Sequence, residues 1–253
     1  MTTFPFYPAD KRKRFEEYAS SYKFDQTDPT PWTPLKRDLK DCKITFITTA
    51  GLRLKSQPLY YIDNVSGCPE YREIPIHTKK ESIIISHTGF DTIEAKKDIN
   101  VIAPIDRIIE LAEERIVDEV NENFFSFFGI HTDLQALERS AGEVGRVLQR
   151  QNVDAIFIIP SSHTCNEVAG IIARTIEKAG ISTISIVTIK EIAEEIKLPR
   201  SLFINFPFGY TLGRAHVLPL QRAIINDMVS ALKTLDRPGK IIDLQYKWEG
   251  TVE

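Results

Sequence analysis

The sequence predicts an α/β protein whose sheets are mainly parallel. Buried-strand patterns at residues 43–49 and 153–159 each end in a short turn, and strands at 182–187 and 201–206 are separated by a helix at 190–196. Such alternation is typical of parallel strands connected by crossover helices. The loops after parallel strands gather at one edge of the sheet, so we expect a site at that edge.

The first 34 residues differ in character from the rest. They are rich in aromatic residues, prolines and charges, and the run from Asp28 to Pro34 cannot hold a regular helix or a central strand. A short helix is expected at 11–22. Aromatic residues in so polar a segment favour packing onto the body or onto a neighbouring subunit. We therefore interpret residues 1–34 as an N-terminal arm and residues 35–253 as the α/β domain.

Further elements follow from the same patterns. A third buried-strand pattern covers 82–86, and Asp106 begins a helical stretch at 107–114, where its charge suits the positive helix end. The other helices are expected at 133–151, from Cys165 to a C-terminal glycine at Gly180, and at 218–233.

Composition excludes several classes of function. A formal net charge of −3 provides no basic field for nucleic acid. The apolar runs are far shorter than the roughly 20 residues of a membrane span, and the N-terminus lacks the pattern of a secretory signal. We therefore expect a cytoplasmic protein. The cysteines, Cys42, Cys68 and Cys165, are widely spaced, which argues against a disulfide framework and a structural zinc site.

The segment from Ser161 to Cys165 joins a buried strand to a helix. Backbone N–H groups and the helix dipole favour negative charge there, so the pKa of Cys165 is expected to fall. His163 is a candidate general base or cation for it, and Ser162 with His163 is a second candidate pair. The alternative is a small buried cysteine whose helix is capped by Ser161 or Ser162.

Two other turns offer polar groups. His87 and Asp91 flank Gly89 after the strand at 82–86, and they would share the crevice with Cys165 if the two strands are parallel neighbours. The alternative is that they make local hydrogen bonds. His87, Asp91, His163 and Cys165 do not have metal-ligand spacing, so no metal is predicted.

The loop at 206–213 is the last candidate. Its glycines, including Gly209, permit a tight turn whose amides would hold a carboxylate or phosphate, although a structural loop explains it equally well. The chain has no Gly-x-Gly-x-x-Gly pattern, so no nucleotide cofactor is predicted.

Ordered blocks of sequence resemble a known family. They are Trp32-Thr-Pro-Leu, Ile47-Thr-Thr-Ala-Gly-Leu, Tyr71-Arg-Glu-Ile-Pro, Ser86-His-Thr-Gly-Phe-Asp, Asp98-Ile-Asn-Val-Ile-Ala-Pro-Ile-Asp-Arg, Val153-Asp-Ala-Ile, Thr164-Cys165, Ile176-Glu-Lys-Ala-Gly-Ile and Pro238-Gly-Lys-Ile. Together they resemble the selenoprotein B family of the glycine, sarcosine, betaine and D-proline reductases, above all the selenocysteine-containing subunit of D-proline reductase. The resemblance covers roughly residues 32–245.

The resemblance also assigns roles. Family reductases carry selenocysteine three positions before a cysteine, as in Sec-Gly-Thr-Cys; here Thr164 and Cys165 match, Ser162 replaces selenocysteine and His163 replaces glycine. It implies an Asp/Glu racemase-like fold of two similar α/β lobes at about 35–130 and 131–253. It further implies a small amino-acid-like substrate, a partner subunit, a homo-oligomer, and an external thiol or protein as electron donor.

Our leading hypothesis is an enzyme that uses Cys165 for C–N or C–S bond cleavage or reduction. Its substrate pocket would include Thr49, Ala50, Gly51, His87, Asp91, Ser161, Thr164 and Gly209, with Cys165, Ser162 and His163 as catalytic residues. One alternative is a catalytically silent subunit or binding protein, because a serine hydroxyl is a poor nucleophile without a base. Another is a non-reductive, thiol-dependent racemase or lyase. Cys68 is expected to be exposed in a polar loop.

Overall fold

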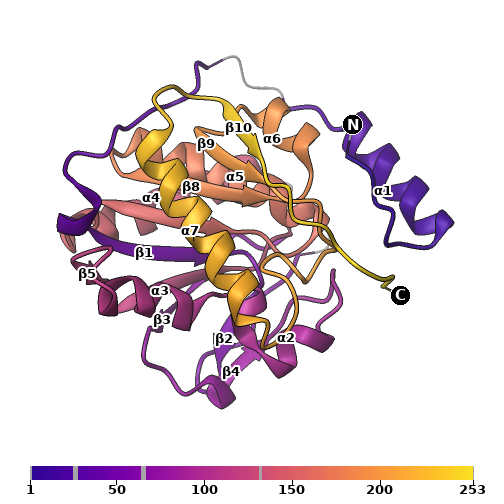
Figure 1. Cartoon of the computed structure of the whole chain (residues 1–253), viewed down its shortest axis with the longest axis horizontal. Helices are drawn as coiled ribbons and strands as arrows, with labels where there is room; N and C mark the ends of the chain where they lie inside the picture. Colours follow the sequence, from indigo (N-terminus) through magenta and orange to yellow (C-terminus); the bar gives the residue numbers. More distant parts are fainter. Residues whose placement is uncertain (1, 25–27, 64–66, 131–132, 253) are drawn as a thin grey trace.

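A single mostly parallel sheet forms the centre of the molecule (Figure 1). The computed structural model describes residues 2–24, 28–63, 67–130 and 133–252. In spatial order the sheet contains β10 (Lys240–Asp243), β9 (Arg200–Phe203), β8 (Ser182–Val187), β7 (Ala155–Ile159), β1 (Lys43–Thr48), β6 (Asn123–Phe127) and β3 (Tyr71–Pro75), and the short β5 (Glu119–Val120) also pairs with β1. Only β3 runs antiparallel to its neighbour in this sheet, as an edge strand beside β6.

The strand expected at 82–86 does not belong to this sheet. β4 (Ile83–Ile85) pairs antiparallel with β2 (Leu52–Leu54) in a separate two-stranded sheet. The condition under which His87 and Asp91 were expected to share the crevice, that their strand and β7 are parallel neighbours, is therefore not met. A short apolar run indicates a strand, but it does not specify the strand's partner.

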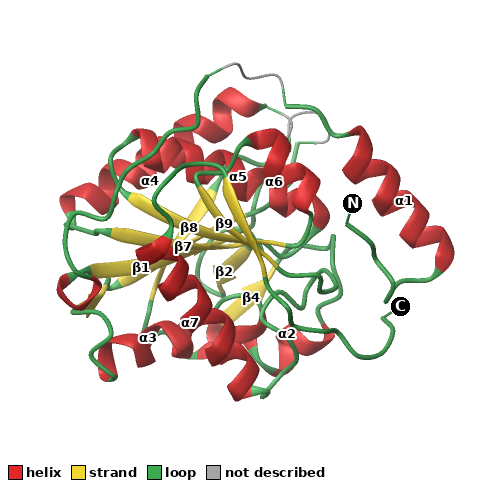
Figure 2. Cartoon of the chain, turned by 45° about the horizontal axis from the view of Figure 1, so that its top comes forward, coloured by secondary structure: helices red, strands yellow, loops and turns green. Residues whose placement is uncertain are grey.

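Helices cover both faces of the central sheet (Figure 2). One layer contains α4 (Leu134–Arg150), α5 (His163–Lys178) and α6 (Lys190–Ile196), and the other contains α3 (Ile105–Glu113) and α7 (Leu218–Thr234). The short α2 (Ile93–Lys97) follows the two-stranded sheet. The α/β architecture expected from the alternating pattern is confirmed.

The strand side chains alternate between these two layers, as the pleat requires. On β1, Phe46 packs in the cluster that contains α3 and α7, whereas Ile47 packs in the cluster that contains α4 and α5. On β7, Phe157 packs in the cluster that contains α3 and α7, and Ile158 packs in the cluster that contains α4 and α5. Both faces of the sheet are thus buried, which explains why its strands read as continuous apolar runs.

The predicted division into two similar lobes is not confirmed. β1 and β6 come from the first half of the chain, β7 to β10 come from the second half, and all of them hydrogen-bond into one sheet. The N-terminal arm lies against this body. Its helix α1 (Ala9–Ser21) is preceded by Phe4 and Phe6, both of which are buried against α6 and its surroundings.

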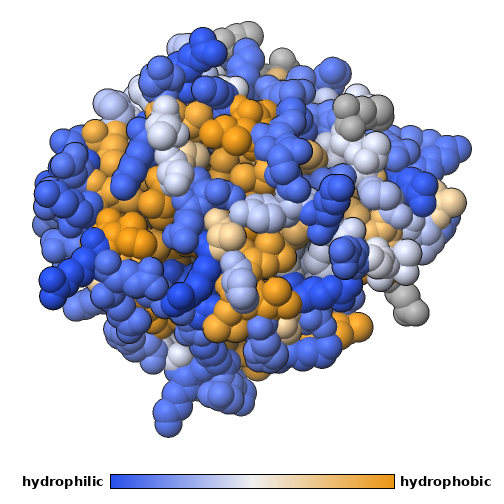
Figure 3. All heavy atoms as spheres, viewed as in Figure 1, coloured by the Kyte–Doolittle hydropathy of each residue, from blue (hydrophilic) through white to orange (hydrophobic). Residues whose placement is uncertain are grey.

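Hydrophilic and apolar side chains are interspersed on the face that Figure 3 shows. The large apolar residues with substantial exposure among the described residues are Leu59, Tyr61, Ile62, Ile93, Val217 and Leu218. No helix in the described part of the chain is long and apolar enough to span a membrane.

Candidate active site

The loops that follow β1 and β7 meet at the C-terminal edge of the sheet. These two strands pair in parallel, but the connection after β1 passes through α3 on one face and the connection after β7 enters α5 on the other. Neighbouring loops that leave a sheet toward opposite faces create a crevice between them, which is where α/β proteins bind ligands. Thr49 follows β1 at this point, and Cys165 follows β7.

Cys165 is the third residue of α5, and Ser162 is its N-cap. The backbone N–H of Cys165 donates to Oγ of Ser162 over 3.3 Å. Ser162 has the extended backbone typical of an N-cap, and its hydroxyl satisfies one of the free amides of the first turn. The cysteine therefore lies at the positive end of the helix dipole.

Three groups surround the sulfur of Cys165. The hydroxyl of Ser162 donates to Sγ over 3.0 Å, and the thiol donates to the carbonyl of Thr49 over 3.1 Å. Nε2 of His87 lies 3.7 Å from Sγ. The cysteine has no exposed surface, and His87 is 2% exposed. The structure thus brings together residues from three segments far apart in sequence.

His87 is oriented by its other ring nitrogen. The backbone N–H of Gly89 donates to Nδ1 over 2.8 Å, so the neutral ring must carry its proton on Nε2. That proton points to Cys165, which makes His87 a hydrogen-bond donor to the sulfur. The ring also stacks on Phe128, with 5.1 Å between the centroids. This arrangement stabilises the thiolate more than the thiol.

The surroundings of Cys165 have opposing effects on its pKa. Complete burial raises the pKa most strongly, because a buried thiolate loses its hydration. His87 makes the largest opposing contribution, the side chains of Ser162 and Thr49 add to it, and together they outweigh burial and lower the pKa from 9.0 to about 7. These interactions favour ionisation of the thiol.

Gly129, which sequence reasoning missed, closes the site on the side of β6. It has a φ of +78°, and a Cβ at this position would lie 2.4 Å from Sγ of Cys165 and 2.4 Å from the carbonyl oxygen of Thr49. Thr164 donates from its hydroxyl to the carbonyl of Gly129 over 2.8 Å. A signal was present in the sequence, because the apolar run at 124–128 ends in a glycine just as the run at 43–49 leads into Gly51.

The histidine beside the sulfur is not the one expected. His163 starts α5, two residues before Cys165, and such positions do not face each other on a helix. Its ring instead contacts Phe15, Tyr18 and Phe208, with centroids 5.2–5.9 Å apart. Burial, with smaller contributions from Arg14 and His87, lowers the pKa of His163 to about 4.

The other predicted residues border the site. Ala50 and Gly51 are buried in the turn after β1, and Gly51 accepts from the backbone of Ser86 over 2.9 Å. Ser161 is buried, and its carbonyl accepts from the N–H of Gly209 over 2.7 Å. The loop at 206–213 therefore lies at the same edge.

Asp91 contacts the loop at 206–213 and makes no hydrogen bond to Cys165 among the described residues. Its carboxylate accepts from the hydroxyl of Tyr210 over 2.5 Å and from the N–H of Ile93 over 2.8 Å. A Cβ on Gly209 would come within 2.2 Å of the carbonyl oxygen of Asp91, so the two turns are in close contact. The bond from Ile93 is a local hydrogen bond of the kind expected in the alternative interpretation, whereas the bond from Tyr210 joins two turns that are far apart in sequence.

The other two cysteines differ from Cys165. Cys42 precedes β1 and lies at the opposite edge of the sheet, and burial raises its pKa to about 11. Cys68 is 2% exposed and packs with Tyr60 and Phe128, so the expectation that it is exposed is wrong. Burial raises its pKa as well. In the part of the chain that the structure describes, no group of three or more metal-ligating side chains occurs.

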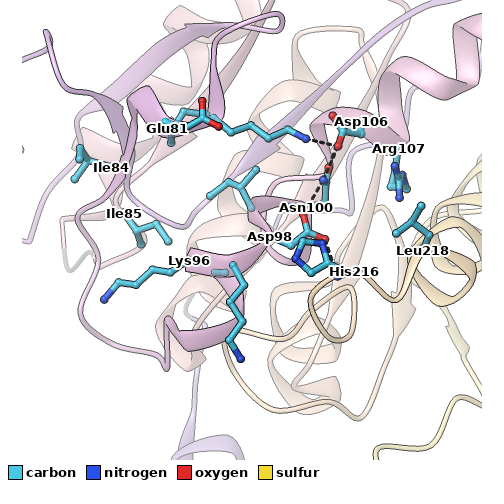
Figure 4. A pocket seen from close by; sticks show the side chains of 15 residues that line it. Glu81, Ile84, Ile85, Lys96, Asp98, Asn100, Asp106, Arg107, His216 and Leu218 are labelled. Carbon is cyan, nitrogen blue, oxygen red and sulfur yellow. Dashed lines mark hydrogen bonds and ion pairs between the residues drawn. The ribbon is translucent and has the colours of Figure 1, made fainter.

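A surface cavity of about 550 Å³ lies between β4, α2 and the start of α3 (Figure 4). None of the residues that contact Cys165 lines it. Its polar side chains bind one another: Asn100 bridges Asp98 and Asp106, donating to each over 2.8 Å, and Lys80 pairs with Asp106. Because these groups are already satisfied, we interpret them as a structural network.

The fold and site define an α/β protein with a hydrogen-bonded cysteine at the switch point of its sheet. The model of the glycine/sarcosine/betaine reductase selenoprotein B family matches residues 11–162. D-proline reductase subunit gamma from Acetoanaerobium sticklandii is 30% identical over 227 residues, 89% of this chain and 93% of that protein. The chain therefore belongs to the glycine/sarcosine/betaine reductase selenoprotein B family, which confirms the resemblance.

More distant relatives are longer than this chain. Glycine reductase complex component B subunit gamma is 25% identical over 246 residues in Peptoclostridium acidaminophilum, covering 93% of this chain and 55% of the relative. The protein of the same name from Symbiobacterium thermophilum is 24% identical over 232 residues, covering 88% and 54%. The chain spans about half the length of these glycine reductase relatives. No solved structure matches it.

Proposed function

We propose that the chain is an enzyme that acts on a small amino-acid-like substrate and uses Cys165 to cleave or reduce a C–N or C–S bond. The observation that carries the proposal is the donation of hydrogen bonds to Sγ by Ser162 and His87. A thiolate stabilised in this way is a nucleophile at neutral pH. The membership of the chain in a family of reductase components supports the same reaction class.

In the proposed reaction the Cys165 thiolate attacks a substrate carbon and forms a C–S bond. The C–N bond breaks, and the amine leaves with the bonding electron pair and takes up a proton. Releasing a reduced product from the thioether requires two electrons and two protons: the C–S bond breaks, the substrate carbon takes up a proton, Cys165 regains its thiol, and two donor thiols become a disulfide. Neither Cys42 nor Cys68 hydrogen-bonds to Cys165 in the described structure, which favours an external thiol or protein as the donor of these electrons.

Unpaired polar groups support a small polar substrate. The hydroxyls of Thr49, Ser86 and Ser161 are buried without a hydrogen-bond partner among the described residues. Leaving such groups unpaired costs about 1–3 kcal/mol each. A ligand with a carboxylate and an amine would supply both acceptors and donors to them.

The test is incubation with D-proline, sarcosine, betaine and glycine, with and without a dithiol reductant. Intact mass and peptide mapping should show an adduct on Cys165 without reductant, and product analysis should show turnover with it. Cys165→Ser should abolish both. Turnover retained in Cys165→Ser would contradict the proposal.

A second candidate is a non-catalytic subunit of a reductase complex. It is favoured by Ser162 at the position that the family resemblance assigns to selenocysteine, and by the complete burial of Cys165. The relatives are themselves named as subunits. Purification from native extract distinguishes the two: a chain that is isolated alone and is active argues against this candidate, whereas activity only in a copurifying complex supports it.

A further inference from the structure

Helix α1 packs over the first turn of α5, next to the candidate active site. The ring centroids of Phe15 and Tyr18, both on α1, lie 5.5 Å and 5.2 Å from that of His163. Phe15 also meets Phe208 edge-on at 4.9 Å. Since His163 and Cys165 share one helical turn, these aromatic side chains cover the turn that carries the thiol.

The segments on both sides of α1 are hydrogen-bonded to the body of the protein. Before α1, Phe4 is fully buried, the N–H of Val252 donates to the carbonyl of Phe6 over 2.9 Å, and the N–H of Phe208 donates to the hydroxyl of Tyr7 over 2.8 Å. These hydrogen bonds hold the start of the chain against the body, while Phe4 and Tyr7 also pack against Phe15 of α1.

After α1, the chain is held at Thr33. Its hydroxyl donates to the carbonyl of Glu177 over 2.7 Å, and its own carbonyl accepts from Ser182 over 2.9 Å and from the guanidinium of Arg200 over 2.7 Å. The side chain of Arg200 also lies over the ring of Trp32 at 3.5 Å. None of these contacts around Thr33 involves a residue of α1.

The helix itself buries few side chains, although Phe15 and Tyr18 are partly buried against the neighbouring aromatic cluster. Ala19 is its one buried residue, and its ion pair joins Lys13 to Glu17 within the helix. Figure 1 shows α1 at the periphery, outside the layer formed by α4, α5 and α6. Segments with few buried apolar contacts open at low free energy while the rest of the fold remains intact.

We propose that α1 is a hinged lid over Cys165. The helix swings away while Phe4 to Tyr7 and Thr33 stay attached, the opening admits substrate to the thiol, and closure returns Cys165 to the dry site seen in the structure. Closing a site in this way excludes water from the reacting groups. The lid rests on the proposed function of Cys165 as the reacting group, but its opening is measurable without turnover.

The first test follows the rate at which iodoacetamide labels Cys165 in the unaltered chain, by peptide mapping at increasing urea concentrations. If α1 opens locally, the rate should depend only weakly on urea, because little surface is exposed. Cys42, in the core, provides the reference for global unfolding. A Cys165 rate with the same steep urea dependence as that of Cys42 would overturn the lid.

The second test weakens the lid directly. The double substitution Phe15→Ala and Tyr18→Ala removes its aromatic contacts and should raise the labelling rate of Cys165 at least about tenfold. Lys13→Ala, on the exposed part of the same helix, is the matched control and should leave the rate unchanged. Equal rates of Cys165 labelling in the unaltered chain, the double variant and Lys13→Ala would overturn the lid.

The two proposals fail in different ways. If the double variant exposes Cys165 but the thiol then reacts more slowly than free cysteine at neutral pH, the lid stands and the thiolate chemistry is wrong. If Cys165 stays protected in the double variant although titration shows a thiolate, the lid is wrong and the proposed function stands.

Discussion

The hydroxyl of Ser162 donates to the sulfur of Cys165 over 3.0 Å and accepts from its backbone N–H over 3.3 Å. One side chain therefore caps α5 and also stabilises the thiolate. The family resemblance pairs these same two positions as selenocysteine and cysteine, and here they face each other across the first turn of the helix.

Substituting Ser162→Ala should separate these two effects. Loss of the N-cap should lower the free energy of unfolding by about 1 kcal/mol, and loss of the hydrogen bond should raise the pKa of Cys165. Urea denaturation and titration of the thiolate measure the two changes. Asp133→Ala, which removes the N-cap of α4, is the control. Asp133→Ala should lower the free energy of unfolding by a similar amount without changing the pKa of Cys165. An equal change in the pKa of Cys165 in both variants would contradict this account.

Substituting Ser162→Cys should create a redox-active pair. The N-cap and the third helical residue are close enough for their side chains to touch here, which is the spacing of a Cys-x-x-Cys motif. Mild oxidation should therefore form a disulfide to Cys165, detected as the loss of two free thiols in one molecule. Ser161→Cys, one residue earlier, should keep its thiol. Failure of the 162 variant to form the disulfide would contradict the observed geometry.

Gly129→Ala tests how closely the site is packed. The new Cβ would clash with both Sγ of Cys165 and the carbonyl of Thr49, so the free energy of unfolding should fall by at least about 3 kcal/mol. Gly239→Ala is a matched control, because Gly239 has nearly the same φ, +77°, and nothing within 4 Å of its Cβ position. It should cost only about 1–2 kcal/mol. Urea denaturation compares them, and equal losses would mean that backbone strain alone matters.

His163 should make the fold sensitive to acid. Its pKa of about 4 in the folded chain lies below the 6.5 of an ordinary histidine, so the unfolded chain binds more protons between these values. The free energy of unfolding should therefore fall by about 3 kcal/mol as the pH decreases through this window.

His163→Phe isolates this contribution, because phenylalanine keeps the contacts to Phe15 and Tyr18 but does not titrate. Urea denaturation at a series of pH values should show a flatter profile for the variant. The pH profile of Lys13→Ala should follow that of the unaltered chain. Parallel profiles for His163→Phe and the unaltered chain would contradict the effect.

Much of the fold could be predicted from the sequence, because strands buried on both faces are continuous apolar runs and the helices keep regular apolar spacing. The runs at 43–49, 153–159 and 182–187 mark central strands for this reason. β6 was missed, although it lies beside β1. The pairing of β4 with β2 could not be predicted either, because partner choice depends on contacts that no local pattern encodes.

The site was predictable to the extent that it depends on local structure. The turn at 161–165 follows from a strand that runs into a helix, so Cys165 at the helix start could be found. The sequence did not show which histidine contacts the sulfur of Cys165. His163 is near in sequence, but the helix turns its side chain away, whereas His87 comes from a loop whose path is set by tertiary packing. The covering by α1 depends on tertiary contacts in the same way.

The most direct test of the central claim is a titration of the Cys165 thiolate by its ultraviolet absorbance, with Cys165→Ser as the blank. This readout does not require access to the thiol. The unaltered chain should titrate with a midpoint near pH 7, and His87→Gln should move the midpoint to about 9 or above, because burial then acts unopposed by the histidine. A midpoint at or above 9.0 in the unaltered chain, or one that His87→Gln leaves unchanged, would contradict the account.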